Sequence, residues 1–505
     1  MESKTPVIVD GRFFLFYFYV TDILMTKFRE IIILLKGNIM FDITIIGCGI
    51  IGAAVAYEFS KYELSVVVLE KENDVSMGAT KANSAIIHAG FDPRPGSLMA
   101  RLNVQGNMLA RELFDVLDIP HKKCGALVLA FSQEEMQTLE KLLETGEANG
   151  VPGLSILSKN DVLKLEPNIS DNIAGALSAP TTMIVSPWEY ALALAEVAVV
   201  NGVKLYTETE VTNIQPVTNG YNIQTTKGEF ATRYIINAAG LFSDDINNMI
   251  NETKIEILPD IGEYFLLDKN EGTQVNQVIF QCPTPQGKGV LVAPTVHGNL
   301  IVGPSSVAVQ SRNDTSNTQK GLDSVKTLAQ KSVPGIDFRA NIRNFSGIRA
   351  KSTVKDFIIT KPNTGFVNLA GIASPGLSAA PAIAKMAVDM VSLDLKPKTN
   401  FIGTRKRVRF HDLSPQEISQ NSAYGNIVCR CETVTEGEVY DALNSPIPPA
   451  SVDGVKRRTT AGLGRCQGGF CAPRIVEILA NWYKCCPTKI LQEGVGTEIL
   501  TSEMK

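Results

Sequence analysis

The chain has 505 residues, which is too long for a single compact core. Of these residues 44% are hydrophobic and 20% charged, a composition typical of a globular protein. Its formal net charge of −4 gives no electrostatic basis for binding nucleic acid, so we expect no nucleic-acid partner. Six of the nine cysteines lie after residue 428, which favours metal ligation in a reducing, cytoplasmic environment over a secreted disulfide framework.

The first 39 residues contain two apolar runs, at residues 13–20 and 31–35. Both are shorter than the roughly 20 apolar residues that a membrane-spanning helix requires. Because Met40 immediately precedes the first predicted strand, we interpret residues 1–39 as an extension ahead of the biological start. A membrane-surface anchor, which would hold the protein peripherally at the inner face of a membrane, is the alternative interpretation.

The next segments predict a βαβ unit made of a strand, a helix and a second strand, at residues 42–46, 50–60 and 64–70. Gly47, Gly49 and Gly52 occupy the strand-to-helix turn of a dinucleotide-binding fold, where they permit a tight turn and close approach of a pyrophosphate. The N-terminus of the helix offers N–H groups to the phosphates. Glu70 ends the second strand, where a carboxylate can bind ribose hydroxyls. The sequence therefore predicts nucleotide binding, but this pattern does not distinguish FAD from NAD.

Three later segments carry a resemblance that does distinguish them. Residues 78–97, 234–240 and 367–377 are similar, in this order, to the flavin-contacting segments of the FAD-dependent amine and hydroxyacid oxidoreductases. In that family the helix starting at the third segment directs N–H groups at the flavin, where negative charge accumulates on reduction. The resemblance implies that FAD is bound by ten residues: Gly47, Gly49, Gly52, Glu70, Thr80, Ser84, Gly240, Gly371, Gly376 and Leu377.

The resemblance covers residues 40–395 and implies an α/β fold. A Rossmann-type FAD-binding domain would be joined to an antiparallel β-sheet substrate domain, built from residues of about 93–184 and 254–344. Strand-like segments that do not alternate with helices support the second part. They lie at residues 173–180, 254–267, 275–281 and 289–303.

The same resemblance implies four residues that would act on the substrate. Arg349 and Lys351 lie in a segment similar to the arginine motif of the glycerol-3-phosphate and 2-hydroxyglutarate enzymes, where a guanidinium would bind a phosphate or carboxylate. His88 is expected to accept the proton of a substrate hydroxyl. Tyr264 would hydrogen-bond a substrate oxygen. Without the resemblance, Arg349 would be interpreted as a solvated surface residue, His88 as a packing residue and Tyr264 as a core residue.

The C-terminal part begins with a polar segment at residues 396–425, predicted to be a linker whose basic run at 404–409 is either solvated or a docking surface. Four cysteines follow as two close pairs, Cys429 with Cys431 and Cys466 with Cys471. Four thiolates are the ligand set of a [2Fe–2S] cluster. A structural zinc site is the alternative, although the single residue between Cys429 and Cys431 is unusual for zinc.

Residues 426–491 resemble the [2Fe–2S]-binding module of bacterioferritin-associated ferredoxin, and residues 492–505 are left as a tail. The resemblance implies a small, mainly helical unit in which the four cysteines hold the cluster. Arg465 and Arg474 are expected to offset the thiolate charge. Thr433 and Thr435 are the candidates for capping the helix that follows Cys431.

The combination of an FAD-dependent oxidoreductase part with a C-terminal [2Fe–2S] part resembles the catalytic subunit of the anaerobic type of FAD-dependent glycerol-3-phosphate dehydrogenase. It implies hydride transfer from sn-glycerol 3-phosphate to FAD, with electrons leaving through the cluster to an electron-accepting protein subunit. L-2-hydroxyglutarate, or another hydroxyacid or amine, is the alternative substrate, because Arg349 would bind a carboxylate as readily as a phosphate. A non-catalytic electron-relay subunit is the alternative from a different functional class.

Overall fold

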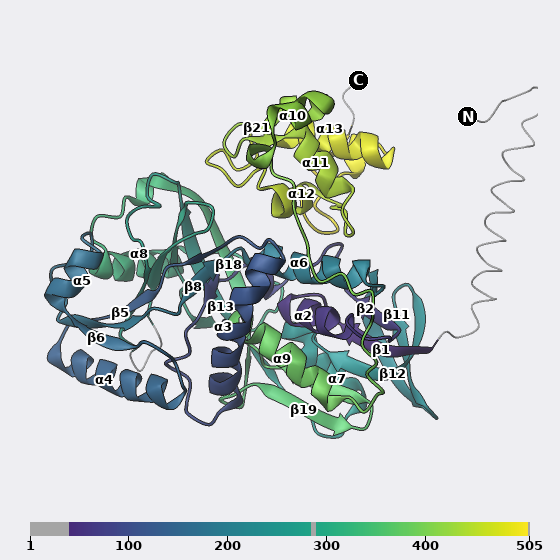
Figure 1. Ribbon diagram of the computed structural model, residues 1–505, viewed down its shortest axis with the longest axis horizontal. Helices are drawn as coiled ribbons and strands as arrows, with labels where there is room; N and C mark the ends of the chain where they lie inside the picture. Colours follow the sequence, from purple (N-terminus) through teal and green to yellow (C-terminus); the bar gives the residue numbers. More distant parts are fainter. Residues whose placement is uncertain (1–39, 284–288, 503–505) are drawn as a thin grey trace, which may run out of the picture. The chain divides into compact units, whose positions relative to one another are not determined.

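The computed structural model describes residues 40–283 and 289–502 of the protein (Figure 1). The extension at residues 1–39, with its start-site and anchor interpretations, lies outside these residues. Across the described part of the chain, no helix is both long and apolar enough to cross a membrane. We refer to residues 40–395 as the body and to residues 426–491 as the module.

Eight strands form the first sheet of the body, and its parallel part contains the predicted βαβ unit. The strands are β1 (Met40–Ile46), β2 (Val66–Leu69), β9 (Lys204–Tyr206), β10 (Val211–Val217), β11 (Gly220–Thr225), β12 (Gly228–Asn237), β19 (Ile358–Asn363) and β20 (Phe366–Ala370). β1 pairs in parallel with β2, with Ile43 opposite Val66, and β2 pairs in parallel with β9. The predicted strand, helix and strand are confirmed, with α2 between β1 and β2.

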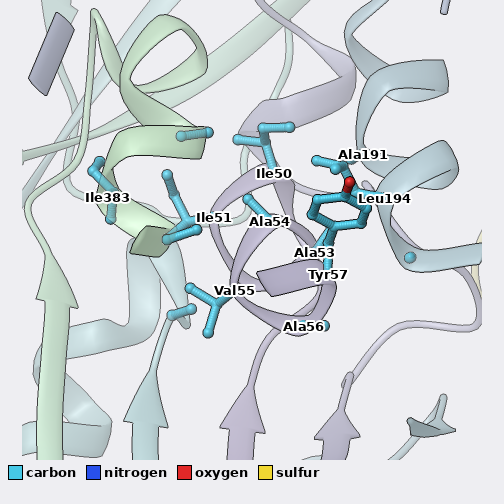
Figure 2. Close-up of a cluster of buried hydrophobic side chains, with 14 of the residues drawn as sticks. Ile50, Ile51, Ala53, Ala54, Val55, Ala56, Tyr57, Ala191, Leu194 and Ile383 are labelled. Carbon is cyan, nitrogen blue, oxygen red and sulfur yellow. The ribbon is translucent and has the colours of Figure 1, made fainter. Parts of the chain in front are cut away.

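The helices of the body in the described residues are α2 (Ile50–Phe59), α3 (Leu98–Val116), α4 (Gln133–Ala148), α5 (Lys159–Leu165), α6 (Pro187–Val200), α7 (Ser243–Ile250), α8 (Gln319–Ser332) and α9 (Gly376–Met390). Of these, α6 and α9 pack against α2 (Figure 2). All ten residues of α2 are buried. Ala191 and Leu194 of α6 and Ile383 of α9 belong to the apolar cluster around it. α2 and α9, whose N-termini are the predicted cofactor contacts, are therefore held by one continuous core.

A second, nine-stranded sheet makes up the rest of the body. Its strands are β5 (Ala126–Ala130), β6 (Ser155–Ser158), β7 (Gly175–Ala179), β13 (Ile257–Leu267), β14 (Val278–Gln281), β15 (Leu291–Pro294), β16 (Leu300–Gly303), β17 (Val307–Ala308) and β18 (Asn341–Ser352). Its pairings are antiparallel except for β5 with β14, so the predicted antiparallel sheet is confirmed with one parallel pair. A smaller sheet joins β3 (Ile86–Ile87), β8 (Met183–Val185) and β4 (His121–Lys123).

The module is a small unit with an apolar core of its own. It contains β21 (Ile427–Cys429), β22 (Val434–Thr435), α11 (Glu436–Leu443), α12 (Val452–Thr459) and α13 (Ala472–Tyr483). Thr435 caps α11 through a capping box, because its hydroxyl accepts the Glu438 N–H while its own N–H donates to the Glu438 carboxylate at 2.8 Å. Thr433, the other candidate, has a φ of 54° and does not make this cap.

The basic run of the linker is not solvated. Arg405 donates to the Glu196 carboxylate at 2.6 Å, Arg407 pairs with Glu189, and Arg409 donates to both carboxylate oxygens of Asp118 at 2.9 Å. The three arginine side chains are only 12%, 14% and 20% exposed. Because alternate residues of an extended segment point the same way, the period-2 spacing of these arginines directs all three at the body. The three arginines of the basic run are therefore bonded to the body, and whether the run also docks a partner stays a prediction.

Candidate functional site

The dinucleotide turn lies between the end of β1 and the start of α2. Gly47 has a φ of 96°, and a Cβ there would lie 2.7 Å from the Ala238 carbonyl oxygen. A Cβ at Gly52 would lie 1.9 Å from the carbonyl oxygen of Gly47. A side chain at either position would therefore collide with backbone, so the turn brings main chain to the place where a pyrophosphate must approach.

Two side chains complete this turn. Glu70 accepts hydrogen bonds from the N–H of Cys48 at 2.6 Å and of Glu72 at 2.9 Å. Burial raises the pKa of Glu70 to about 7, against the lowering effect of these two N–H groups. The hydroxyl of Thr80 accepts the N–H of Ile50 at 2.9 Å, in the first turn of α2. Backbone without side chains, a helix start and a buried acid fit the pyrophosphate and ribose of a dinucleotide.

His88 lies where the segment after β3 meets the start of α9. Its N–H donates to the Ser378 hydroxyl at 2.7 Å, and its Nε2 lies 3.5 Å from the Ser374 hydroxyl. Its carbonyl oxygen accepts from the side-chain amides of Asn103 and Asn107, at 3.2 and 3.1 Å. The His88 backbone is thereby fixed beside Gly376 and Leu377, the first residues of α9.

Tyr264 of β13 contacts the same segment of chain. Its hydroxyl lies 3.1 Å from the Ser84 hydroxyl, and its ring stacks on Phe345 of β18 with centroids 4.8 Å apart. This hydrogen bond joins two of the predicted residues, one from the flavin-contacting segment and one from the second sheet. It also gives the Tyr264 hydroxyl a partner within the protein.

Arg349 and Lys351 point to the same side of β18 and share one carboxylate. Arg349 pairs with Asp260 and donates to the Ser305 carbonyl oxygen at 3.1 Å, while Lys351 Nζ lies 2.7 Å from Asp260. Asp260 is directly opposite Arg349 in the β13–β18 ladder. Two cations around one carboxylate leave a net positive charge, which suits an anionic ligand.

The predicted residues thus fall into separate networks. Five of them converge on the α2 turn: Gly47, Gly49, Gly52, Glu70 and Thr80. Gly240 opens the 3₁₀ turn after β12, and Gly371 follows β20. His88 bonds to α9, whereas Arg349 bonds to Asp260 and Ser305. Asp260 was not predicted from the sequence. The available signal was an aspartate within an apolar, strand-like segment, and the structure shows this aspartate to be buried.

The four module cysteines pair across the two sequence motifs. The Cys431 thiol donates to Cys466 Sγ at 3.7 Å, and the Cys471 thiol donates to Cys429. Cys429 and Cys471 are each 1% exposed, while Cys431 and Cys466 are exposed. Among residues 40–283 and 289–502, no three His, Cys, Asp or Glu side chains converge as one metal ion would require. The two pairs together would supply the four thiolates that a [2Fe–2S] cluster takes.

Backbone N–H groups surround these sulfurs. The N–H groups of Gly462, Glu432 and Cys431 donate to Cys429, and those of Phe470 and Gly468 donate to Cys466. Donation from the Cys471 thiol, opposed by burial, lowers the pKa of Cys429 to about 5, and the same contact raises the pKa of Cys471. N–H groups directed at cysteine sulfurs are what an iron–sulfur cluster requires of its protein, so the residues fit that cofactor.

Neither predicted arginine offsets the thiolate charge. Arg465 donates to the Asp268 carboxylate at 2.9 Å, and Arg474 pairs with Glu436 at 2.9 Å and with Glu477 at 2.6 Å. Their charges are therefore taken by carboxylates, and the N–H groups are the donors that face the sulfurs.

Comparisons with known proteins agree with these two sites. The family model described as FAD dependent oxidoreductase matches residues 42–390, and the model described as BFD-like [2Fe-2S] binding domain matches residues 427–481. A protein of Caloramator mitchellensis named glycerol 3-phosphate dehydrogenase is 48% identical, over 92% of this chain and 99% of its own length.

Two further relatives cover the body. The mitochondrial L-2-hydroxyglutarate dehydrogenase of Homo sapiens is 35% identical over 54% of this chain and 62% of its own length. The solved structure of L-alpha-glycerophosphate oxidase from Mycoplasma pneumoniae, with FAD bound, is 33% identical, with a TM-score of 0.70 over 73% of this chain and 99% of that one. The chain belongs to the FAD-dependent oxidoreductase family and carries a C-terminal BFD-like [2Fe–2S]-binding domain.

Proposed function

We propose that the protein oxidises sn-glycerol 3-phosphate to dihydroxyacetone phosphate and passes the electrons through its iron–sulfur module. The observation that carries the proposal is the 48% identity to the Caloramator glycerol 3-phosphate dehydrogenase over 92% of this chain. The positive charge of Arg349 and Lys351 around Asp260 supports an anionic substrate.

Bound FAD would supply the acceptor for a hydride from the substrate carbon. In the proposal, Arg349 and Lys351 hold the phosphate, and Asp260 keeps both cations on one side of β18. His88 takes the hydroxyl proton, and its fixed backbone keeps the imidazole beside the start of α9. Tyr264, oriented by Ser84 and Phe345, donates a hydrogen bond to a substrate oxygen.

The electrons would then leave one at a time for an acceptor. Cys429, Cys431, Cys466 and Cys471 would hold the cluster that carries them, because two sulfur pairs lie together in the module. We propose an electron-accepting protein subunit as the partner, with the enzyme cytoplasmic and at most peripheral at the membrane.

The proposal is tested by anaerobic titration of the purified holoprotein with sn-glycerol 3-phosphate. We expect the visible absorption of the oxidised flavin to bleach at once, with L-2-hydroxyglutarate inert. Bleaching by 2-hydroxyglutarate alone would replace the substrate while keeping the family and chemistry. The human relative makes this the second candidate, since a guanidinium binds a carboxylate as well as a phosphate.

The role of Arg349 separates an enzyme from a passive electron relay. Arg349→Ala should lower kcat/KM by about a hundredfold, because a charged, two-pronged grip on the substrate is lost while the FAD contacts remain. Arg339→Ala is the matched control, because Arg339 is 92% exposed and pairs with Asp337 at the surface. Unchanged turnover in Arg349→Ala would favour the relay subunit.

A further inference from the structure

A buried cluster of charge joins the body to the module. Asp74 of the body accepts hydrogen bonds from Arg457 Nη2 at 2.9 Å and from Arg458 Nη1 and Nη2 at 2.9 and 2.8 Å. Asp74 is 2% exposed, and the arginine side chains are 6% and 4% exposed. Burial alone would raise the pKa of Asp74, but the charges of Arg458 and Arg457 hold it well below its usual range.

Asp74 lies in the loop that runs from Glu70 to Thr80, two residues of the predicted nucleotide site. The loop is bonded to the glycine turn, because the Ser76 N–H donates to the Cys48 carbonyl oxygen at 3.0 Å. Asp74 also accepts the N–H of Val75 at 2.8 Å, which stiffens the loop locally. The carboxylate that receives the two arginines is therefore carried by a loop that is bonded to the dinucleotide turn.

The segment after the module strengthens the same contact. Glu493 pairs with Arg457 at 3.2 Å and with Lys81 at 2.5 Å, and its carbonyl oxygen accepts from the Asn73 side chain at 2.8 Å. The residues predicted as a tail thus bridge α12 and the nucleotide loop. Asp74, Arg457 and Arg458 form the buried part of the network, and Glu493, which is 32% exposed, closes it at the edge.

A second set of contacts lies next to the cysteines and is built differently. Lys269 pairs with Glu432, beside Cys431, and Asp268 pairs with Arg465, beside Cys466. Lys269 is 44% exposed and Arg465 is 70% exposed. Exposed ion pairs contribute little to stability, whereas removing one partner of a buried pair leaves an uncompensated charge. The buried cluster is therefore the ion-pair contact between body and module whose disruption should cost most.

We propose that Asp74 is a positioning residue for electron transfer between flavin and cluster: by gripping Arg457 and Arg458 it locks the module to the nucleotide loop and fixes the distance between the two cofactors. This inference rests on the proposed flow of electrons from FAD to the cluster, but not on the identity of the substrate. When both cofactors are bound, reduced flavin would supply two electrons and release its protons to solvent. The cluster would take one electron at a time, one ferric ion becoming ferrous, and a one-electron oxidant would have to remove the first electron before the second follows.

The test compares three variants of the holoprotein: Asp74→Asn, Asp74→Glu and Asp244→Asn. Asp244 is the matched control, since it is also a buried carboxylate paired with an arginine, Arg312, but within the body. The flavin is photoreduced, so that no substrate is needed, and the appearance of the reduced cluster is followed by electron paramagnetic resonance. We expect Asp74→Asn to slow cluster reduction by about tenfold or more, because two buried arginines lose their counter-charge.

Two further readouts keep the test decisive. In Asp74→Asn, amide hydrogen exchange should rise in residues 70–81 and 452–459 of the resting protein, whereas Asp244→Asn should leave both segments protected. Asp74→Glu should restore much of the rate, since it keeps the charge. Cluster reduction and exchange in Asp74→Asn equal to wild type would overturn the inference. Should Asp74→Asn fail to fold, Arg458→Lys provides the same comparison with the charge retained and the paired hydrogen bonds lost. A wild-type flavin that ignores glycerol 3-phosphate would instead overturn the proposed function alone.

Discussion

The two candidate redox sites are assembled in different ways. The dinucleotide turn draws on β1, α2 and the loop after β2, which follow one another in the sequence, and on the end of the distant β12, and these segments share one apolar core. The cysteine site draws on two short loops of a small module, and two of its four sulfurs are exposed. We infer that tertiary packing forms the first site in advance, and we expect bound iron to stabilise the exposed half of the second.

The strongest test of this difference removes one cluster ligand. Cys471→Ser should reduce the iron content to less than about a tenth of wild type, because a buried thiolate ligand is replaced by a hydroxyl. FAD content should stay unchanged, since the flavin residues belong to another core. Iron and flavin analysis of the purified variant checks both. Cys485→Ser is the control, because Cys485 is outside the two sulfur pairs; full iron retention in Cys471→Ser would contradict the assignment of this ligand.

A methyl group at the glycine turn tests the other side of the comparison. Gly52→Ala should destabilise the body by about 3 kcal/mol, because its Cβ would lie 1.9 Å from the Gly47 carbonyl oxygen. FAD should be lost while iron is retained, the reverse of Cys471→Ser. Denaturant unfolding and cofactor analysis measure the outcome. Gly78→Ala is the matched control, since nothing lies within 4 Å of its Cβ; equal stability of the two variants would show that the turn is not closely packed.

The smallest expected effect is a pH dependence of stability caused by Glu70, and it tests whether the nucleotide site is formed before FAD binds. Burial raises the pKa of Glu70 from 4.5 to about 7, so between these pH values the native FAD-free protein binds a proton that the unfolded chain has lost. The free energy of unfolding should therefore fall as pH rises through this window, by at most about 3 kcal/mol.

Glu70→Gln should remove this pH dependence, because an amide does not titrate. Unfolding by urea at several pH values, on FAD-free wild type and variant, measures the difference. Parallel curves for the two proteins would mean that Glu70 is ionised throughout and that its carboxylate is better solvated than its burial indicates.

The sequence predicted what depends on local chemistry. The βαβ unit around Gly47, Gly49 and Gly52 follows from strand and helix patterns joined by a turn of known requirements, and the structure has it. The cysteine spacing predicted the ligand number, but not that Cys431 would lie against Cys466. That pairing is a tertiary contact between two loops, which spacing along the chain does not encode.

The carboxylates that pair with the predicted arginines could not be predicted from the sequence, because these pairs are also tertiary contacts. Arg349 was singled out without Asp260, and Arg465 was assigned to the thiolates although Asp268 takes it. An arginine in the sequence predicts an anionic partner but not which residue it is. Strand register, or the contact between separate parts of the fold, decides which carboxylate pairs with it. Asp74, with two arginines about 380 residues further along the chain, is the extreme case.

The arginine-docked linker has a mechanical consequence. Arg405, Arg407 and Arg409 fasten part of the linker to the body, which shortens the free chain between α9 and the module. We therefore expect the module to move little toward a distant acceptor. In the proposed electron flow the acceptor comes to the module, so internal electron transfer should be indifferent to solvent viscosity, while the onward step should slow in viscous solution as the encounter between two proteins does.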